Sequence, residues 1–259
     1  MTDKSQFLAV RHGALNGSTY EVSQLVEDTL GLEKYLPERT ITPCFEGDLV
    51  QVRETGEVVF THENFRHFSQ QHYQDLRERK LAASLKEVLD RIAVYQQRCS
   101  DKKVVLCLEA KTITSEKTIN EAIKAVHEYG FIDVYFDSFF GDKLDAVDRA
   151  NKQQGTMYTK SLHLLGNVGN KKFTATKAKN GYDILTVPHT TSFGNLSEPV
   201  IYGAVGSIEI LQRMADDPLV FGAYVRLAEG AGIRGAVRKL WNSVRNTERR
   251  KQIDLPENK

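Results

Sequence analysis

Short apolar runs alternate with longer amphipathic segments along nearly the whole chain. Apolar runs of about four to eight residues are typical of buried strands, whereas apolar positions three and four apart predict helices. On this basis the predicted strands span residues 7–11, 41–52, 104–109, 132–136, 157–165, 184–187, 201–205 and 220–227. The strand over 104–109 is apolar on both faces, as in a parallel sheet covered by helices.

Helical periodicity fills the intervals between these strands. The predicted helices span residues 20–30, 84–97, 115–129, 143–151 and 207–214. Two of them have recognisable starts, because Ser84 lies three residues before Glu87 and Ser115 lies three before Thr118. A serine in this position accepts a hydrogen bond from the first turn of a helix.

Strand and helix alternate about eight times, which predicts a parallel sheet of the α/β class. Eight such units in a chain of 259 residues match the usual size of a (β/α)8 TIM barrel. An open doubly wound sheet is the alternative, but the first strand-to-helix turn, RHGALNGS, has no glycine fingerprint for a dinucleotide. We therefore predict one TIM-barrel domain over residues 1–248 and a charged C-terminal tail over 249–259.

Charge, apolar runs and cysteine spacing limit the partners and the location that we expect for this protein. A formal net charge of +1 gives no broad attraction to nucleic acid. Residues 234–251 are basic, which we interpret as a solvated surface that leaves peripheral membrane contact open. We expect no secretory signal and no transmembrane segment, because no apolar run is long enough. Three cysteines without metal-binding spacing favour a reducing cytoplasm as the location. Oligomeric state does not follow from the sequence.

The segment FEGDLVQVRETGEVVFTHE, residues 45–63, carries the strongest chemical signal. Alternate side chains of a strand leave the same face, so Glu46 and Asp48 point together. Two carboxylates that converge repel each other unless a cation or a shared proton lies between them. An isolated acidic pair also fits a solvated edge strand. Glu109 and Lys111, at the end of a buried strand, favour a site instead.

In a TIM barrel the catalytic groups lie at the C-terminal ends of the strands. His12 follows the first strand, Glu46 and Asp48 lie late in the second, and His62 ends the arm attached to the second strand. Glu109 and Lys111 end the third. Carboxylates, a lysine and histidines on one rim predict a hard divalent cation and a phosphate.

These residues resemble the glycerophosphodiester phosphodiesterase family, within the phospholipase-C-like barrel phosphodiesterases. The matching residues are His12, Glu46-Gly47-Asp48, the turn Glu54-Thr55-Gly56, the run from Val58 to Glu63 that contains His62, and Glu109-Ala110-Lys111. The resemblance is good from about residue 7 to 140. It implies a phosphoric diester hydrolase that acts on a small-molecule or lipid-derived phosphodiester.

The resemblance also implies roles. Glu46, Asp48 and Glu109 would hold Mg²⁺ or Ca²⁺, Lys111 would neutralise charge on the phosphate, and His12 and His62 would be general base and general acid. A neighbouring substrate hydroxyl would attack first and give a cyclic phosphate, or the first histidine would itself be the nucleophile.

Two departures from the family pattern leave alternatives open. The chain reads Arg11-His12-Gly13 where the family has His-Arg-Gly, and Glu27-Asp28-Thr29 is at best a remnant of Glu-Asn-Thr. The sphingomyelinase-D-like branch lacks both elements, so a lyase-type phospholipase D that releases a cyclic phosphate is one alternative. A catalytically silent barrel that binds a phosphorylated ligand is the other. A sugar-phosphate aldolase or isomerase ranks last because it has no need of the acidic pair.

The remaining polar residues are predicted to set specificity. We interpret His67 and His72 as part of a solvated loop or substrate lid. Lys160 is the candidate phosphate contact from the later strands. The other residues that we expect at the barrel mouth are His163, His189, Tyr224 and Arg226.

Overall fold

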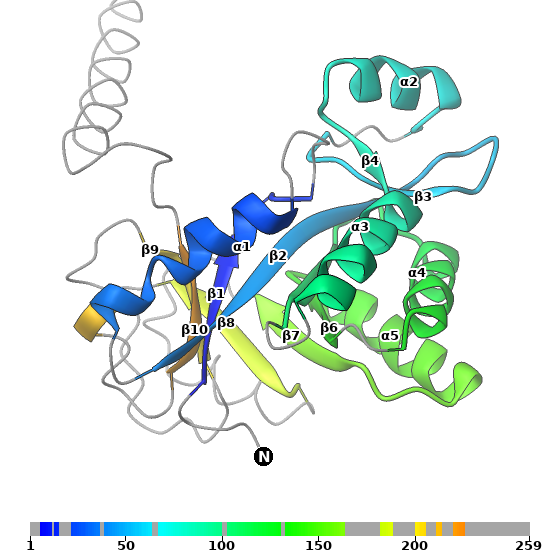
Figure 1. Ribbon diagram of the computed structural model, residues 1–259. Coiled ribbons are helices and arrows are strands. Elements are labelled where there is room, and N and C mark those ends of the chain that lie inside the picture. Colours follow the sequence, from blue (N-terminus) through cyan, green and yellow to red (C-terminus); the bar gives the residue numbers. More distant parts are fainter. Residues whose placement is uncertain are drawn as a thin grey trace, which may run out of the picture. The chain divides into compact units, whose positions relative to one another are not determined.

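The structure is a computed structural model in which eleven segments of the chain are described (Figure 1). They are residues 6–11, 13–15, 22–36, 39–63, 67–99, 103–130, 133–163, 182–188, 200–205, 211–213 and 220–225. All of them belong to one compact unit, Met1–Val225. The predicted domain boundary at residue 248 and the tail 249–259 lie outside the described residues.

Eight parallel strands close into a barrel, as the alternating pattern predicts. Neighbours pair in the order β1-β2-β5-β6-β7-β8-β9-β10, and β10 returns to β1. The strands are β1 (Gln6–Arg11), β2 (Thr40–Gln51), β5 (Val105–Ala110), β6 (Asp133–Ser138), β7 (Thr159–His163), β8 (Ile184–Pro188), β9 (Val200–Val205) and β10 (Val220–Val225). The fold is therefore a (β/α)8 TIM barrel.

Helices connect the strands and cover the outside of the barrel (Figure 1). They are α1 (Val22–Leu30), the 3-10 turn η1 (Glu33–Tyr35), α2 (Gln70–Glu78), α3 (Leu85–Arg98), α4 (Glu116–Glu128) and α5 (Gly141–Gln154). The two predicted helix starts are confirmed, because Ser84 accepts the N–H of Glu87 and Ser115 accepts the N–H of Thr118. The helix predicted over 207–214 is described only at 211–213, which is helical.

Strand β2 is longer than its barrel neighbours because its end also forms a hairpin. Leu49 pairs with Ala110 of β5 and with Phe60 of β3 (Val58–Phe60), which runs antiparallel to β2. The short strand β4 (Ala83–Ser84) extends this sheet. The hairpin therefore begins where the barrel part of β2 ends, immediately after Asp48.

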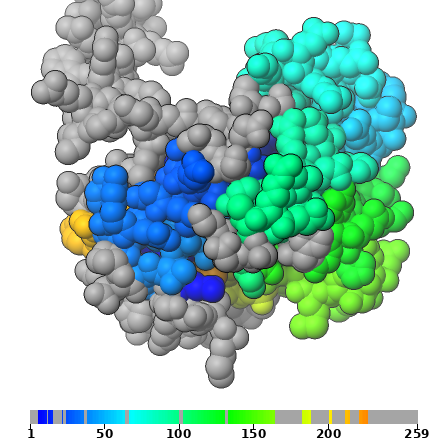
Figure 2. Space-filling model, in the orientation of Figure 1, coloured from blue at the N-terminus to red at the C-terminus, as the bar shows by residue number. Residues whose placement is uncertain are grey.

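Helix α2 packs on this hairpin, and the sequence did not predict it. In Figure 2 its side chains, in cyan, stand beside those of α3. Tyr73 and Leu76 are the buried residues of α2, and they join a small apolar cluster with the hairpin residues Val50 and Val59. The histidine-rich segment is thus not a loop throughout. His72 lies in the first turn of α2, where it forms a capping box with Ser69.

The inside of the barrel is filled by an apolar cluster from seven strands. Its buried members are Leu8, Val10, Cys44, Cys107, Tyr135, Ile184, Ile201 and Tyr224. Cys44 and Cys107 are free thiols, and burial raises the pKa of both. They act as small apolar residues of the barrel interior. The polar residues of the site lie further along the same inward-facing positions. No helix within the described part of the chain is long and apolar enough to cross a membrane.

Candidate metal centre at the barrel mouth

Three carboxylates from β2 and β5 meet at the C-terminal ends of these strands. Glu46 and Asp48 are two residues apart and both point inward, as alternation predicts. Asp48 pairs in register with Glu109. All three side chains are buried, with exposed fractions of 0%, 0% and 2%. One ligand oxygen from each lies within 4.8 Å of the others.

Gly47 makes this geometry feasible from the other face of β2. A Cβ atom there would lie 2.6 Å from Cδ1 of Phe60 and 2.8 Å from Cβ of Leu15. The hairpin and the turn after β1 therefore press directly on the backbone between the two acids. A glycine is needed at this position because of this close approach.

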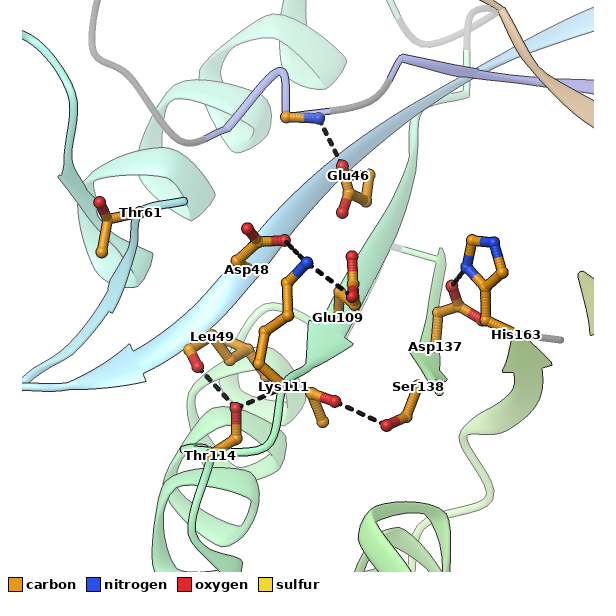
Figure 3. Close-up of polar contacts among 12 residues, drawn as sticks. Glu46, Asp48, Leu49, Thr61, Glu109, Lys111, Thr114, Asp137, Ser138 and His163 are labelled. Carbon is orange, nitrogen blue, oxygen red and sulfur yellow. Dashed lines mark hydrogen bonds and ion pairs between the residues drawn. The ribbon is translucent and has the colours of Figure 1, made fainter. Parts of the chain in front are cut away.

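Lys111 lies against the carboxylates (Figure 3). Its Nζ atom is 2.8 Å from Oε1 of Glu109 and 3.4 Å from Oδ1 of Asp48. Thr114 holds the backbone here: it accepts the N–H of Lys111 at 2.9 Å and donates to the carbonyl of Leu49 at 2.8 Å. The lysine predicted for the site is thus anchored to both strands that carry the acids.

Burial and crowding raise the pKa of two of these carboxylates, Glu109 and Asp48. The pKa of Glu109 is raised to about 7: burial contributes most, hydrogen bonding and like charge from Glu46 add to the shift, and Lys111 opposes it. Burial also raises the pKa of Asp48, and the charge of Glu109 adds to this. Burial lowers the pKa of Lys111, but the charges of Asp48 and Glu109 outweigh it and leave this pKa above its ordinary value.

The donor set fits a hard divalent cation. Carboxylate oxygens are the ligands that Mg²⁺ and Ca²⁺ prefer. Among the described residues, Lys111 lies beside these three buried carboxylates. The pKa of Glu109 is raised first by burial and then by Glu46, and a divalent ion would relieve the like-charge part of this cost. The residues predicted as metal ligands are therefore brought together in a geometry that suits the predicted metal.

Of the two predicted catalytic histidines, the structure describes only His62. His12 lies outside the described residues, but the turn that follows it is described. There the N–H of Gly13 donates to the carboxylate of Glu46, and the N–H of Leu15 donates to the carbonyl of Glu46 at 3.1 Å. His62 is exposed just after β3, and its charge lowers the pKa of Asp48. The described neighbours of both histidines thus adjoin the metal centre.

A fourth buried acid, Asp137, escaped the sequence analysis. It lies on β6 in register with Glu109 and is fully buried. Its Oδ2 atom lies 3.0 Å from Nδ1 of His163 and accepts the hydroxyl of Tyr224 at 3.0 Å. The available signal was the alternation Tyr135, Asp137 at the end of a buried strand, which parallels Cys107, Glu109 one strand earlier.

The prediction that Lys160 contacts phosphate is wrong. Residues 161 and 163 of β7 face the barrel, so Lys160 points outward. Its Nζ atom lies 2.7 Å from Oδ2 of Asp148 on α5. His163 and Tyr224 do face the barrel interior, where both contact the carboxylate of Asp137. His189 and Arg226 lie outside the described residues.

Comparison with known proteins supports the fold. A glycerophosphodiester phosphodiesterase from Parabacteroides distasonis superposes with a TM-score of 0.55 at 13% identity, over 93% of this chain and 98% of that chain. The carboxyl transferase domain of Rhizobium etli pyruvate carboxylase, with pyruvate, gives a TM-score of 0.49 at 11% identity, over 86% of this chain and 40% of that chain. The second score is too low to carry an argument. At 13% identity the first likeness shows a shared barrel fold. No protein-family model matches the sequence, and no curated protein matches it.

Proposed function

We propose that this protein is a metal-dependent phosphodiesterase that hydrolyses a glycerophosphodiester-like or lipid-derived phosphodiester. One observation carries the proposal: Glu46, Asp48 and Glu109 converge, buried, beside Lys111 at the C-terminal mouth of a (β/α)8 barrel. This is the end of the fold where catalytic groups lie. The resemblance of the motifs to glycerophosphodiester phosphodiesterases, and the barrel shared with one of them, support the same reading.

The chemistry required is mainly charge neutralisation, because a phosphodiester is an anion that repels nucleophiles. Glu46, Asp48 and Glu109 would hold Mg²⁺ or Ca²⁺, which supplies positive charge to a non-bridging phosphate oxygen. Lys111 would donate from its Nζ atom to the same phosphate. In this role its ammonium group exchanges part of its contact with Asp48 and Glu109 for contact with the substrate.

Proton transfer would fall to the histidines at the rim. His12 would take the proton of the attacking hydroxyl, and His62 would give one to the departing alcohol. An imidazole suits both tasks because its ordinary pKa lies near neutrality, at about 6.5. Attack by a neighbouring substrate hydroxyl would form a cyclic phosphate, which water then opens. If water did not open it, the cyclic phosphate would be the end product.

The test is hydrolysis of a glycerophosphodiester, which carries the neighbouring hydroxyl, and of bis(p-nitrophenyl) phosphate, which water must attack directly, each with Mg²⁺, Mn²⁺ or Ca²⁺, and with EDTA. Glu46→Gln keeps the size of the side chain and an oxygen for the N–H of Gly13 but removes the charge, so activity is expected to fall at least a hundredfold. Glu116→Gln is the matched control, since Glu116 is an exposed residue of α4 paired with Arg149.

Activity that requires metal, is lost in Glu46→Gln and persists in Glu116→Gln is the expected result. Activity that is indifferent to EDTA and to Glu46→Gln would refute the metal centre. If no metal supports hydrolysis of this or any glycerophosphodiester, the phosphodiesterase proposal fails in favour of a barrel that binds phosphorylated ligands.

A further inference from the structure

Asp137 is a fourth acid at the barrel mouth, and the proposed chemistry does not use it. Asp48, Glu109 and Asp137 lie in register on the neighbouring parallel strands β2, β5 and β6. All three side chains are buried, and they form a row across the barrel wall at one level. Figure 3 shows Asp137 on the strand next to Glu109, on the side away from Asp48. The row thus extends one strand beyond the proposed metal ligands.

Two contacts hold the carboxylate of Asp137 in place. Its Oδ2 atom accepts the hydroxyl of Tyr224 at 3.0 Å and lies 3.0 Å from Nδ1 of His163. Tyr224 is fixed in turn, because its hydroxyl lies 3.5 Å from Sγ of Cys107. His163 belongs to β7 and Tyr224 to β10. Neither contact therefore comes from the strands that carry the proposed metal ligands.

This arrangement makes Asp137 a neighbour of the metal centre and not one of its ligands. The acids that offer oxygens within 4.8 Å of one another are Glu46, Asp48 and Glu109. Asp137 lies on the next strand, and neighbouring strands are about 4.8 Å apart. A charge at that range still acts on the centre, because water and salt screen buried charges much less than exposed ones.

The charge of Asp137 favours positive charge at the centre. Burial and Glu46 raise the pKa of Glu109 most, and the charge of Asp137 adds to this shift. A proton on Glu109 and a cation held by the three ligands are positive charges in the same place, so the same field favours both. Lys111 does not cancel this field, because its ammonium group is paired with Asp48 and Glu109.

We propose that Asp137 strengthens the binding of a cation at Glu46, Asp48 and Glu109 through its charge, without being a ligand, and that it thereby favours cations of higher charge. This inference rests on the proposed function for the presence of a cation at these ligands. Asp137 is then a determinant of cation affinity and selectivity, and Tyr224 is a residue that positions it.

Asp137→Asn tests the inference, because the amide has nearly the size of the carboxylate and keeps an oxygen for the hydroxyl of Tyr224 but carries no charge. Calorimetry measures the binding of Ca²⁺ and of Tb³⁺, a trivalent cation that also prefers oxygen ligands, at a pH above the pKa of Glu109 of about 7. A Coulomb energy is proportional to the charge of the cation, so we expect Kd to rise about tenfold for Ca²⁺ and about thirtyfold for Tb³⁺.

Two further variants make the test specific. Tyr224→Phe removes a contact of Asp137 but keeps its charge, so it should change both constants far less than Asp137→Asn does. Asp142→Asn is the matched control, because Asp142 is an exposed acid at the start of α5, and it should leave both constants unchanged. Unchanged constants in Asp137→Asn overturn the inference. An equal loss for Ca²⁺ and Tb³⁺ also overturns it, since the substitution would then act by displacing the ligands.

Cation binding and hydrolysis, measured on the same variants, separate this inference from the proposed function. Metal-dependent hydrolysis with unchanged cation affinity in Asp137→Asn refutes the role of Asp137 and leaves the phosphodiesterase standing. A loss of affinity that grows with cation charge, without hydrolysis of any phosphodiester, refutes the phosphodiesterase and leaves the role of Asp137 standing. If neither cation bound the wild type, the metal centre and both proposals would fail.

Discussion

At the scale of single residues, Glu109 is a carboxylate whose ionisation is disfavoured in the folded protein without a cation. Its pKa of about 7 exceeds its ordinary value of 4.5 chiefly because the side chain is buried. The folded state thus binds this proton more tightly than the unfolded state. The stabilisation is complete below about pH 4.5 and is lost as the pH rises through about 7.

Metal-free protein is therefore expected to lose stability between about pH 4.5 and 7, by up to about 3 kcal/mol from this one group. Urea unfolding in EDTA across this range measures the loss. Glu109→Gln cannot ionise and should flatten the profile, while Glu87→Gln, on the surface of α3, should not. A profile equally steep in Glu109→Gln would show that other groups cause the pH dependence.

Lys111 gives a second prediction, because its two possible roles differ in what its removal changes. Loss of a counter-ion to the carboxylates changes metal affinity, whereas loss of a group that binds the phosphate lowers kcat. Lys111→Met removes the ammonium group from between Asp48 and Glu109, so a divalent cation gains an undivided set of negative ligands. We expect metal affinity to rise a few fold while kcat falls by a hundredfold or more.

Calorimetry of Mg²⁺ binding and steady-state kinetics measure the two effects of Lys111→Met. Lys86→Met, which removes an exposed lysine paired with Asp90, is the control. A variant with raised metal affinity and unchanged kcat would mean that Lys111 serves only as a counter-ion.

At the scale of elements, β2 shows how far the sequence predicts the site. Alternation alone placed Glu46 and Asp48 on one face, because the spacing of side chains along a strand is fixed by the backbone. Alternation also places Tyr135 and Asp137 on one face, but a single acid at the end of a strand fits a solvated position equally well, so this signal alone did not mark Asp137 as a site residue. Helix α2 was missed because only Tyr73 and Leu76 of its nine residues are buried apolar groups, too few for a helical period. Lys160 was misplaced because the face that each residue of β7 presents depends on where the strand pairs.

Gly47 gives a prediction at the same scale. Gly47→Ala introduces a Cβ atom that would lie 2.6 Å from Cδ1 of Phe60 and 2.8 Å from Cβ of Leu15. Strand β2 or the hairpin must shift, so we expect a loss of about 1–3 kcal/mol in unfolding free energy. Activity should fall more than stability requires, because the shift displaces both flanking carboxylates.

The control for Gly47→Ala is Gly130→Ala, at the turn after α4, where the nearest atom to an added Cβ lies at 3.7 Å. It should change the unfolding free energy by less than about 0.5 kcal/mol. Denaturant melts and kcat/KM of the two variants are compared. If Gly47→Ala behaved like Gly130→Ala, the close approach of the hairpin would not constrain the site.

At the scale of the whole molecule, the parallel arrangement of the barrel strands brings the site together. Residues 46 and 137 are far apart in sequence, yet both face the mouth because their strands are parallel and their carboxyl ends meet at one rim. The alternation of strands and helices was sufficient to predict the barrel. Closure itself was not visible in the sequence, because the pairing of β1 with β10 joins segments more than 200 residues apart.

Because the proposed metal ligands come from two neighbouring barrel strands, a cation should stabilise the whole barrel. The folded state assembles Glu46, Asp48 and Glu109 within 4.8 Å, whereas the unfolded chain disperses them. A ligand at a hundred times its Kd then adds about 2.7 kcal/mol to the unfolding free energy. For a barrel of this size, at about 2–4 °C for each kcal/mol, we expect Tm to rise by roughly 5–11 °C with Mg²⁺ or Ca²⁺ at this concentration. Asp48→Asn should abolish the rise, while Asp90→Asn, which changes an exposed acid on α3, should leave it intact. Thermal melts with and without metal measure the rise in Tm for each variant. A rise of equal size in Asp48→Asn would place the cation elsewhere on the molecule.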